Sequence, residues 1–240
     1  MKTKSPSRQV RMTAEVTARM HELVPKFLAG FAARDLAVIM EAGKVRRFPA
    51  RSLLAVEGDR ADTLFLILEG LARTYTTTPN GEKVVLLWVP SGETAGGRSF
   101  LSQPVKYMVT TETVTECLAL VWGRSEILPL RKRYPRLIEN ALLNAADYLE
   151  RYLNLHVAAG YGNAAQRLAR VLGNLAKGIG KKSFEGAVIH VSNQELADEA
   201  NVTIFTVSRQ LNEWQRKGLL QKSRMRIVVR SPEELVRNAG

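Results

Sequence analysis

Residues 192–220 read SNQELADEANVTIFTVSRQLNEWQRKGLL and contain signals for two helix starts. Ser192 followed by Glu195 fits a capping box, in which the serine hydroxyl caps the helix and the glutamate reaches back to the backbone. Asn201 can form a turn, and Thr203 can cap a second helix. The segment therefore predicts two short helices joined by a tight turn, which is a helix-turn-helix.

The second helix is predicted to run to about Lys217 and to have two different faces. Val207, Leu211 and Trp214 lie at positions i, i+4 and i+7 and form one apolar stripe. The opposite face carries Ile204, Phe205, Ser208, Arg209, Asn212 and Arg216. Because the apolar stripe can be buried against the first helix, the opposite face is left to contact a partner.

Gly218 is predicted to end this helix, and a basic hairpin follows it. Residues 219–229 read LLQKSRMRIVV, which predicts two short strands around Gln221–Arg226. A hairpin in this position stands beside the helix-turn-helix as a wing. The last third of the chain is therefore predicted to be a winged helix-turn-helix.

The distribution of charge favours a polyanion as the partner of this module. The chain has 35 Lys and Arg against 23 Asp and Glu, a formal net charge of +12. Residues 161–240 carry thirteen basic and seven acidic side chains, and residues 1–30 carry six and two. Residues 31–160 are almost balanced, with sixteen and fourteen. A basic end that coincides with a winged helix predicts double-stranded DNA as the partner.

Residues 44–122 have the pattern of short strands separated by turns. Leu64–Leu68, Ala72–Thr76 and Val84–Val89 are rich in β-branched and apolar residues. Asn80-Gly81 can supply the tight turn of a hairpin. Strands at this density, with no helices between them, predict a small antiparallel roll or barrel.

A long helix is predicted to follow from Pro135 to Gly160. Its apolar positions have the 4-3 spacing of a coiled-coil seam and are Ile138, Leu142, Ala145, Leu149, Tyr152, His156 and Ala159. At 1.5 Å per residue such a helix is about 37 Å long, which is more than a small roll needs. We therefore expect a homodimer along this seam; packing of the helix on its own domain is the alternative. Residues 160–163 read GYGN and are predicted to form a hinge.

The predicted fold class is α+β with three regions. Residues 1–134 are predicted to form a basic helical N-terminal segment and an antiparallel β-roll. Residues 135–160 form the dimerisation helix, and residues 161–240 form the winged helix-turn-helix that binds DNA.

The composition argues against several other classes of protein. Cys117 is the single cysteine, so an intramolecular disulfide and a cysteine-built iron–sulfur or zinc site are excluded. The three histidines are too scattered for a metal cluster. No apolar run reaches about 18 residues and the N-terminus lacks a signal-peptide core, so we expect no membrane span and a cytoplasmic protein. The motifs of phosphate loops, nucleophile elbows and metal helices are absent from the sequence, so we expect no enzyme.

Together these features resemble the Crp/Fnr family of bacterial transcription regulators over about residues 30–230. The order of β-roll, long dimer helix and winged helix is that of the family. Residues 203–211, TIFTVSRQL, are similar to its recognition-helix pattern. The roll is punctuated by glycines and resembles a cyclic-nucleotide-binding domain; the glycines are Gly58, Gly70, Gly81, Gly92 and Gly96. The resemblance implies that the roll within residues 1–134 binds an effector. It also implies a homodimer on an inverted-repeat DNA site, with RNA polymerase as a further partner.

The resemblance also implies roles for residues of the DNA-binding module. Arg209 matches the arginine that enters the major groove, where a guanidinium can bond to guanine O6 and N7. The candidates for base reading are Ile204, Phe205, Arg209 and Asn212. The candidates for phosphate contacts are Asn193, Gln194, Thr203, Thr206, Ser208, Arg224 and Arg226.

The effector region departs from the pattern of the cyclic-AMP-binding members. Gly97 stands in place of the glutamate that binds the ribose, and Tyr107-Met108 replace an arginine-serine pair that binds the cyclic phosphate. Tyr152-Leu153 replace a threonine-serine pair that reads adenine. We expect weak or no binding of cyclic AMP, and a less polar effector or an anion held by Arg98. The pocket candidates are Gly96, Gly97, Arg98, Ser99, Phe100, Tyr107, Met108, Tyr152 and Leu153.

Two alternatives stay open at this point. One is a haem- or other small-ligand-sensing regulator of the same family, in which His21, His156 or Cys117 would supply axial ligands. Against haem, Cys117 is predicted to be a buried strand residue, His21 lies in the N-terminal basic segment, and His190 is predicted to lie in a strand. The other alternative is a nucleotide-binding adaptor that does not contact DNA.

Overall fold

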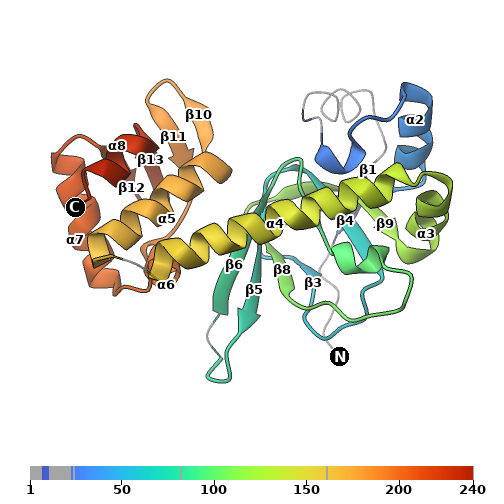
Figure 1. Ribbon diagram of the computed structural model, residues 1–240, viewed down its shortest axis with the longest axis horizontal. Coiled ribbons are helices and arrows are strands. Elements are labelled where there is room, and N and C mark those ends of the chain that lie inside the picture. The colour runs from blue at the N-terminus through green and yellow to red at the C-terminus, as the bar shows by residue number, and fades with distance from the viewer. Residues whose placement is uncertain (1–6, 11–22, 24, 82, 161, 240) are drawn as a thin grey trace. The chain divides into compact units, whose positions relative to one another are not determined.

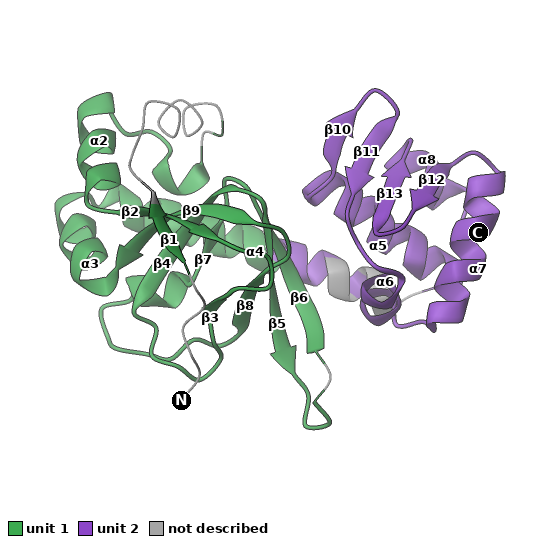
Figure 2. Ribbon diagram, turned by 180° about the vertical axis from the view of Figure 1, so that it is seen from behind, with its two compact units in different colours: residues 1–149 green, residues 150–240 purple. Residues whose placement is uncertain are grey.

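The computed structural model describes residues 7–10, 23, 25–81, 83–160 and 162–239. The chain divides into two compact units, residues 1–149 and 150–240 (Figure 2). The division falls inside the long helix α4 (Arg136–Gly160), which is visible in yellow in Figure 1.

The first unit is built on two antiparallel sheets, so the predicted β-roll and α+β fold class are confirmed. The five-stranded sheet has the order β1-β2-β9-β4-β7, with β1 Arg8–Val10, β2 Lys44–Phe48, β9 Cys117–Gly123, β4 Thr63–Glu69 and β7 Thr94–Ala95. The four-stranded sheet has the order β3-β8-β5-β6, with β3 Leu53–Ala55, β8 Thr110–Thr113, β5 Leu71–Thr77 and β6 Lys83–Pro90. The three strands that the sequence predicted lie within β4, β5 and β6.

Strand β4 lies at the centre of the core. Successive side chains of a strand point to opposite faces, and here both faces are covered. Leu64, Leu66 and Leu68 pack in one cluster with Trp122 of β9. Phe65 and Ile67, which point to the other face of the strand, pack in a second cluster. Burial on both faces explains why β4 is a continuous apolar run and not an alternating one.

Short helices complete the first unit. They are η1 (Lys26–Leu28), α2 (Ala33–Glu41), η2 (Gly97–Phe100) and α3 (Arg124–Arg133). The prediction of an N-terminal helical segment is wrong for Arg8–Val10, which forms strand β1 and pairs with β2 from Val45 to Arg47. This pairing adds a strand to the edge of β2 and satisfies its backbone groups by ladder hydrogen bonds, which a helix does not form. Most of the remaining N-terminal segment, including His21, lies outside the described residues.

The second unit contains the predicted helix-turn-helix and wing. The helices are α5 (Ala164–Gly178), α6 (Asn193–Ala200), α7 (Ile204–Arg216) and α8 (Pro232–Arg237). A four-stranded antiparallel sheet has the order β10-β11-β13-β12, with β10 Lys181–Ser183, β11 Gly186–Ile189, β13 Arg226–Val229 and β12 Leu220–Ser223. Helix α5, strand β10 and helix α8 were not predicted, and of the hairpin β10–β11 only a strand at His190 was expected. His190 follows strand β11 and does not lie in it, which corrects its predicted placement.

Candidate nucleic-acid interface

The caps predicted for the helix-turn-helix are confirmed. The backbone N–H of Glu195 donates to the Ser192 hydroxyl (3.1 Å), and the Glu195 carboxylate accepts from the Ser192 N–H (2.8 Å). Asn201 ends α6 with φ +49, a left-handed conformation that asparagine tolerates. The Thr203 hydroxyl accepts the N–H of Thr206 (3.2 Å) and starts α7. These local contacts fix the turn between the two helices.

Helix α7 separates a buried stripe from an exposed face. Val207, Leu211 and Trp214 are completely buried, as predicted from their spacing. The described side chains of the opposite face are exposed or half-buried and include all four candidates for base reading, namely Ile204, Phe205, Arg209 and Asn212. Phe205 is 82% exposed, so nothing within the described chain covers its ring. The exposed face therefore combines apolar contacts, one guanidinium and one amide.

The candidates for phosphate contacts differ in how free their polar groups are. The Gln194 amide donates to the carboxylate of Asp198 (2.7 Å), and the Thr203 hydroxyl, which caps α7, lies 3.0 Å from that of Thr206. Asn193 and Ser208 are half-buried. Arg224 is exposed and Arg226 is half-buried, and in the described part of the chain neither is in an ion pair. The two wing arginines are therefore the charged candidates for phosphate contacts, and within the described ranges their charges are not neutralised by an ion pair.

The wing is fixed to the end of α7. Strands β12 and β13 pair from Leu220 opposite Val229 to Ser223 opposite Arg226. The N–H of Lys222 donates to the side-chain oxygen of Gln215 on α7 (2.9 Å). The position of the wing is thus set by the helix that carries the candidate base readers.

Arg167, on α5, connects the predicted hinge with the helix-turn-helix. Its guanidinium donates to the carbonyl of Gly162 (2.9 Å) and to the carbonyls of Ala200 (3.1 Å) and Asn201 (3.0 Å). Sequence reasoning missed this residue. The capping box that opens α5, Asn163 with Gln166, is a local signal that would have found the helix. The contact of Arg167 with Gly162 is local as well, but its contacts with Ala200 and Asn201 depend on tertiary structure.

Helix α4 leaves an apolar face uncovered. In the predicted seam Ile138, Leu142, Leu149 and Tyr152 are 48%, 70%, 59% and 42% exposed, and Ala145 is exposed as well. Leu143, Leu153 and Val157 widen this face. The side chains of His156 and Ala159 lie outside the described residues. The helix begins at Arg136, so Pro135 precedes it and is not its first residue.

The face of α4 that packs against the roll is partly polar. Leu137 is completely buried. The Asn140 amide donates to the carbonyls of Phe27 and Ala29 (both 3.0 Å), and the Tyr148 hydroxyl donates to a carbonyl of β7. These hydrogen bonds hold the first half of α4 to its own unit and turn the apolar face away from it.

The turn that carries the effector candidates is closed by its own hydrogen bonds. Gly96 has φ +75, and a Cβ there would lie 2.4 Å from the carbonyl oxygen of Thr63, so the position requires glycine. The Ser99 hydroxyl donates to the Gly96 carbonyl (2.8 Å). A Cβ at Gly97 would meet nothing within 4 Å, and Arg98 is half-buried.

The aromatic candidates of this region have other contacts than those predicted. Phe100 is a core residue, packed edge-on against Phe27, and does not line an open pocket. Tyr107 is buried and its hydroxyl accepts the Thr63 N–H (3.0 Å) and donates to the Thr63 carbonyl (2.8 Å). Burial raises the pKa of Tyr107. Met108 is exposed. The structure thus distributes Phe100, Tyr107 and Met108 between core and surface, while Tyr152 and Leu153 are exposed on the part of α4 that belongs to the second unit.

Cys117 is buried in β9, as predicted. Burial raises the pKa of its thiol to about 11. Among the described residues no three His, Cys, Asp or Glu side chains are grouped so that they could hold a metal ion.

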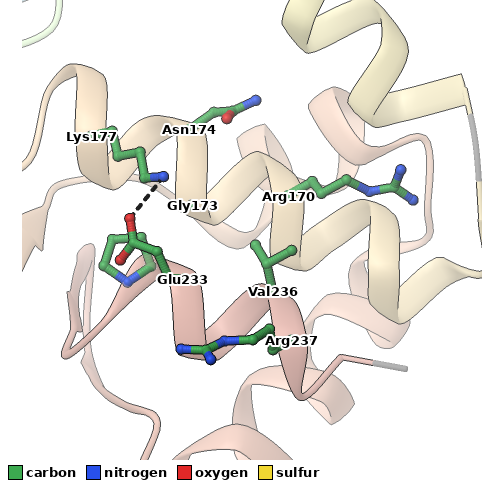
Figure 3. A pocket seen from close by; sticks show the side chains of 8 residues that line it. Arg170, Gly173, Asn174, Lys177, Glu233, Val236 and Arg237 are labelled. Atoms are coloured by element: carbon green, nitrogen blue, oxygen red, sulfur yellow. Dashed lines mark ion pairs between the residues drawn. The ribbon is translucent and has the colours of Figure 1, made fainter.

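A pocket of about 540 Å³ is lined by residues of α5 and α8 (Figure 3). Lys177 and Glu233 form an ion pair across it (2.9 Å), and the hydrogen bond from Lys177 lowers the pKa of Glu233. The guanidinium groups of Arg170 and Arg237 extend in different directions. Since these cations do not converge on one point, we interpret the pocket as the gap along the contact between α5 and α8.

No helix in the described ranges has the length and apolar character of a membrane span.

Comparison with known proteins matches residues 45–134 to the cyclic nucleotide-binding domain and residues 166–237 to the Crp-like helix-turn-helix domain.

Individual relatives cover most of the chain. The transcriptional regulator LdrP of Thermus thermophilus is 27% identical over 197 residues, which are 82% of this chain and 97% of that protein. The solved structure of TTHB099, a CRP-family transcriptional regulator of Thermus thermophilus, has a TM-score of 0.67 at 25% identity and covers 81% of this chain and 96% of its own. FixK2 of Bradyrhizobium japonicum shares the fold with a TM-score of 0.70 at 17% identity, over 81% of this chain and 96% of its own.

Proposed function

The chain belongs to the Crp/Fnr family of DNA-binding transcription regulators, which are not enzymes, and from this premise we propose that it binds an inverted-repeat DNA site as a homodimer. Residues 1–134 would carry the effector-binding roll, residues 135–160 the dimer interface and residues 161–240 the DNA-binding module. The protein would act in the cytoplasm, where a bacterial chromosome lies, and RNA polymerase would be its further partner.

The exposed face of α7 is the observation that carries the DNA-binding part of this proposal. A recognition helix reads base edges in the major groove with side chains near its N-terminus. Arg209 is exposed there and can donate two hydrogen bonds to one guanine. Ile204 and Phe205 have no group that could bond to a base edge, so they would contact a thymine methyl or exclude a competing base. The half-site should therefore contain one guanine for Arg209 and differ from the sites read by the cyclic-AMP-binding members.

The uncovered face of α4 supports a homodimer. Its apolar side chains repeat at the spacing that lets two helices pack as a coiled coil, and the roll covers only the opposite face of the helix. A second copy of α4 is the occupant whose apolar stripe has the same length and spacing. In a two-fold dimer the two recognition helices would lie about 34 Å apart, one turn of DNA.

The effector pocket is proposed not to bind cyclic AMP. Position 97 offers no carboxylate, and the Tyr107 hydroxyl is already bonded to the Thr63 backbone. A charge-assisted contact contributes about 1.5–3 kcal/mol, so the loss of several such contacts should remove measurable affinity. An effector that biases the winged helices about the residue 161–163 hinge would be less polar, or an anion bound by Arg98.

A gel-shift assay at physiological salt, with a pool of random duplexes, tests DNA binding itself. We expect retarded complexes that a specific competitor displaces. Absence of any shift would favour an adaptor that binds nucleotides but not DNA.

A further inference from the structure

Met225, at the tip of the wing, has a backbone conformation that favours glycine. The last pair of hairpin β12–β13 is Ser223 with Arg226, so the loop consists of Arg224 and Met225. Met225 has φ +59. A residue with a Cβ is strained in this left-handed region, which glycine adopts without penalty. The wing therefore keeps a methionine at its tip at a cost in folding stability.

Packing within the chain does not compensate for this cost. The base of the hairpin is buried through Ile227, Val228 and Val229, whereas the Met225 side chain is 50% exposed. Backbone strain that persists at an exposed position is a reason to look for a function outside the fold itself. An apolar side chain held out at a strained tip has the properties of a contact residue.

The surroundings of the tip indicate which partner it contacts. Arg224 and Arg226 flank Met225, and in the part of the chain that the structure describes neither arginine is in an ion pair. Two available cations beside an apolar side chain fit DNA, whose phosphates attract cations and whose minor groove admits apolar side chains. The hydrogen bond between Lys222 and Gln215 holds the wing next to α7. The tip thus approaches the same DNA that α7 would read.

We propose that Met225 enters the minor groove beside the half-site read by α7, with Arg224 and Arg226 on the phosphates at its edges. This assignment rests on the proposed function. With α7 in the major groove, the groove across the adjoining phosphate backbone is the minor groove, and methionine is among the apolar side chains that proteins insert there. The G·C pair adds an amino group to the floor of this groove. Met225 would therefore favour A·T pairs at the flank of the half-site without any hydrogen bond.

The substitution Met225→Gly separates this role from a structural one, because it removes the contact and relieves the strain. We expect its Tm to equal or exceed that of the wild type, while its affinity for the selected site falls about tenfold, the effect of losing a half-buried methionine contact. The salt dependence of binding should not change, since no phosphate contact is lost.

Arg51→Gly is the matched control. Arg51 is exposed in the first unit and has φ +63, so glycine relieves the same strain there. We expect its Tm to behave like that of Met225→Gly and its DNA affinity to stay within about twofold of the wild type, although it loses one positive charge.

A base analogue tests the groove. Replacing A·T pairs at the flank by 2,6-diaminopurine·T adds an amino group to the minor groove and leaves the major groove unchanged. The wild type should lose affinity on this duplex, and Met225→Gly should not. If both proteins bind both duplexes equally, or if Tm and affinity of Met225→Gly fall together, the wing assignment is overturned and the proposed function stands. A wild-type protein that binds no DNA overturns both.

Discussion

Replacing Leu142 and Leu149 by lysine should dissociate the homodimer, and the structure sets the size of the effect. The two side chains are 70% and 59% exposed in the single chain. Full burial of a leucine contributes about 1.5–3 kcal/mol, so covering the exposed parts of both leucines in both protomers contributes about 4–8 kcal/mol. Since about 1.4 kcal/mol is tenfold in affinity, we expect Leu142→Lys with Leu149→Lys to raise the dimer Kd at least about a thousandfold.

Sedimentation velocity at micromolar protein is the assay. The wild type should sediment as a dimer and the double variant as a folded monomer, because these positions are exposed in the chain itself and exposed substitutions usually change stability by no more than about 0.5 kcal/mol. Asn154→Lys, at an exposed position off the seam, is the control and should leave the dimer intact. A wild-type monomer under these conditions, or a double variant that still dimerises, would refute the reasoning.

Three further predictions concern DNA, ligand and pH. Arg209→Ala should cost about 1–3 kcal/mol of DNA-binding free energy per half-site and relax the preference at one base pair. Arg224→Ala should instead weaken binding to all sequences and reduce the salt dependence of the binding constant by about one in slope. An unchanged base preference in Arg209→Ala would contradict the assignment of Arg209. Calorimetry with millimolar cyclic AMP should detect no binding, and a micromolar Kd would show that the departures at positions 97 and 107 do not matter. Because burial raises the pKa of Cys117 to about 11, its thiol should resist alkylation at pH 8 in the native protein and react at once when unfolded. The unfolded thiol ionises first as the pH rises, so folding stability should fall between about pH 9 and pH 11; rapid labelling of the native thiol would be the contrary result.

The parts of the fold that were predictable have local signals. Ser192 and Glu195 satisfy each other across three residues, and the apolar stripe of α7 follows from helical spacing alone. The same holds for the strands of the roll, whose turns contain glycine. Helix α5 had an equally local signal at Asn163 and Gln166, which sequence reasoning overlooked.

The rest depends on partners that are remote in sequence. Asn140 is buried because its amide reaches the carbonyl of Phe27, more than a hundred residues away, and a polar residue inside a helix gives no hint of this. Phe100 and Tyr107 lie close together in sequence, yet the packing of the roll places them in two different clusters. The sequence therefore shows that these residues are aromatic, but it does not show which contacts place each of them in the core.

Selection of binding sites from random duplexes, with the wild-type protein at about 0.15 M salt, tests the central claim most directly. The account predicts one enriched motif, an inverted repeat whose half-sites are centred about one helical turn apart and each contain a guanine. Enrichment of a single unrepeated half-site, or of no sequence, would contradict it.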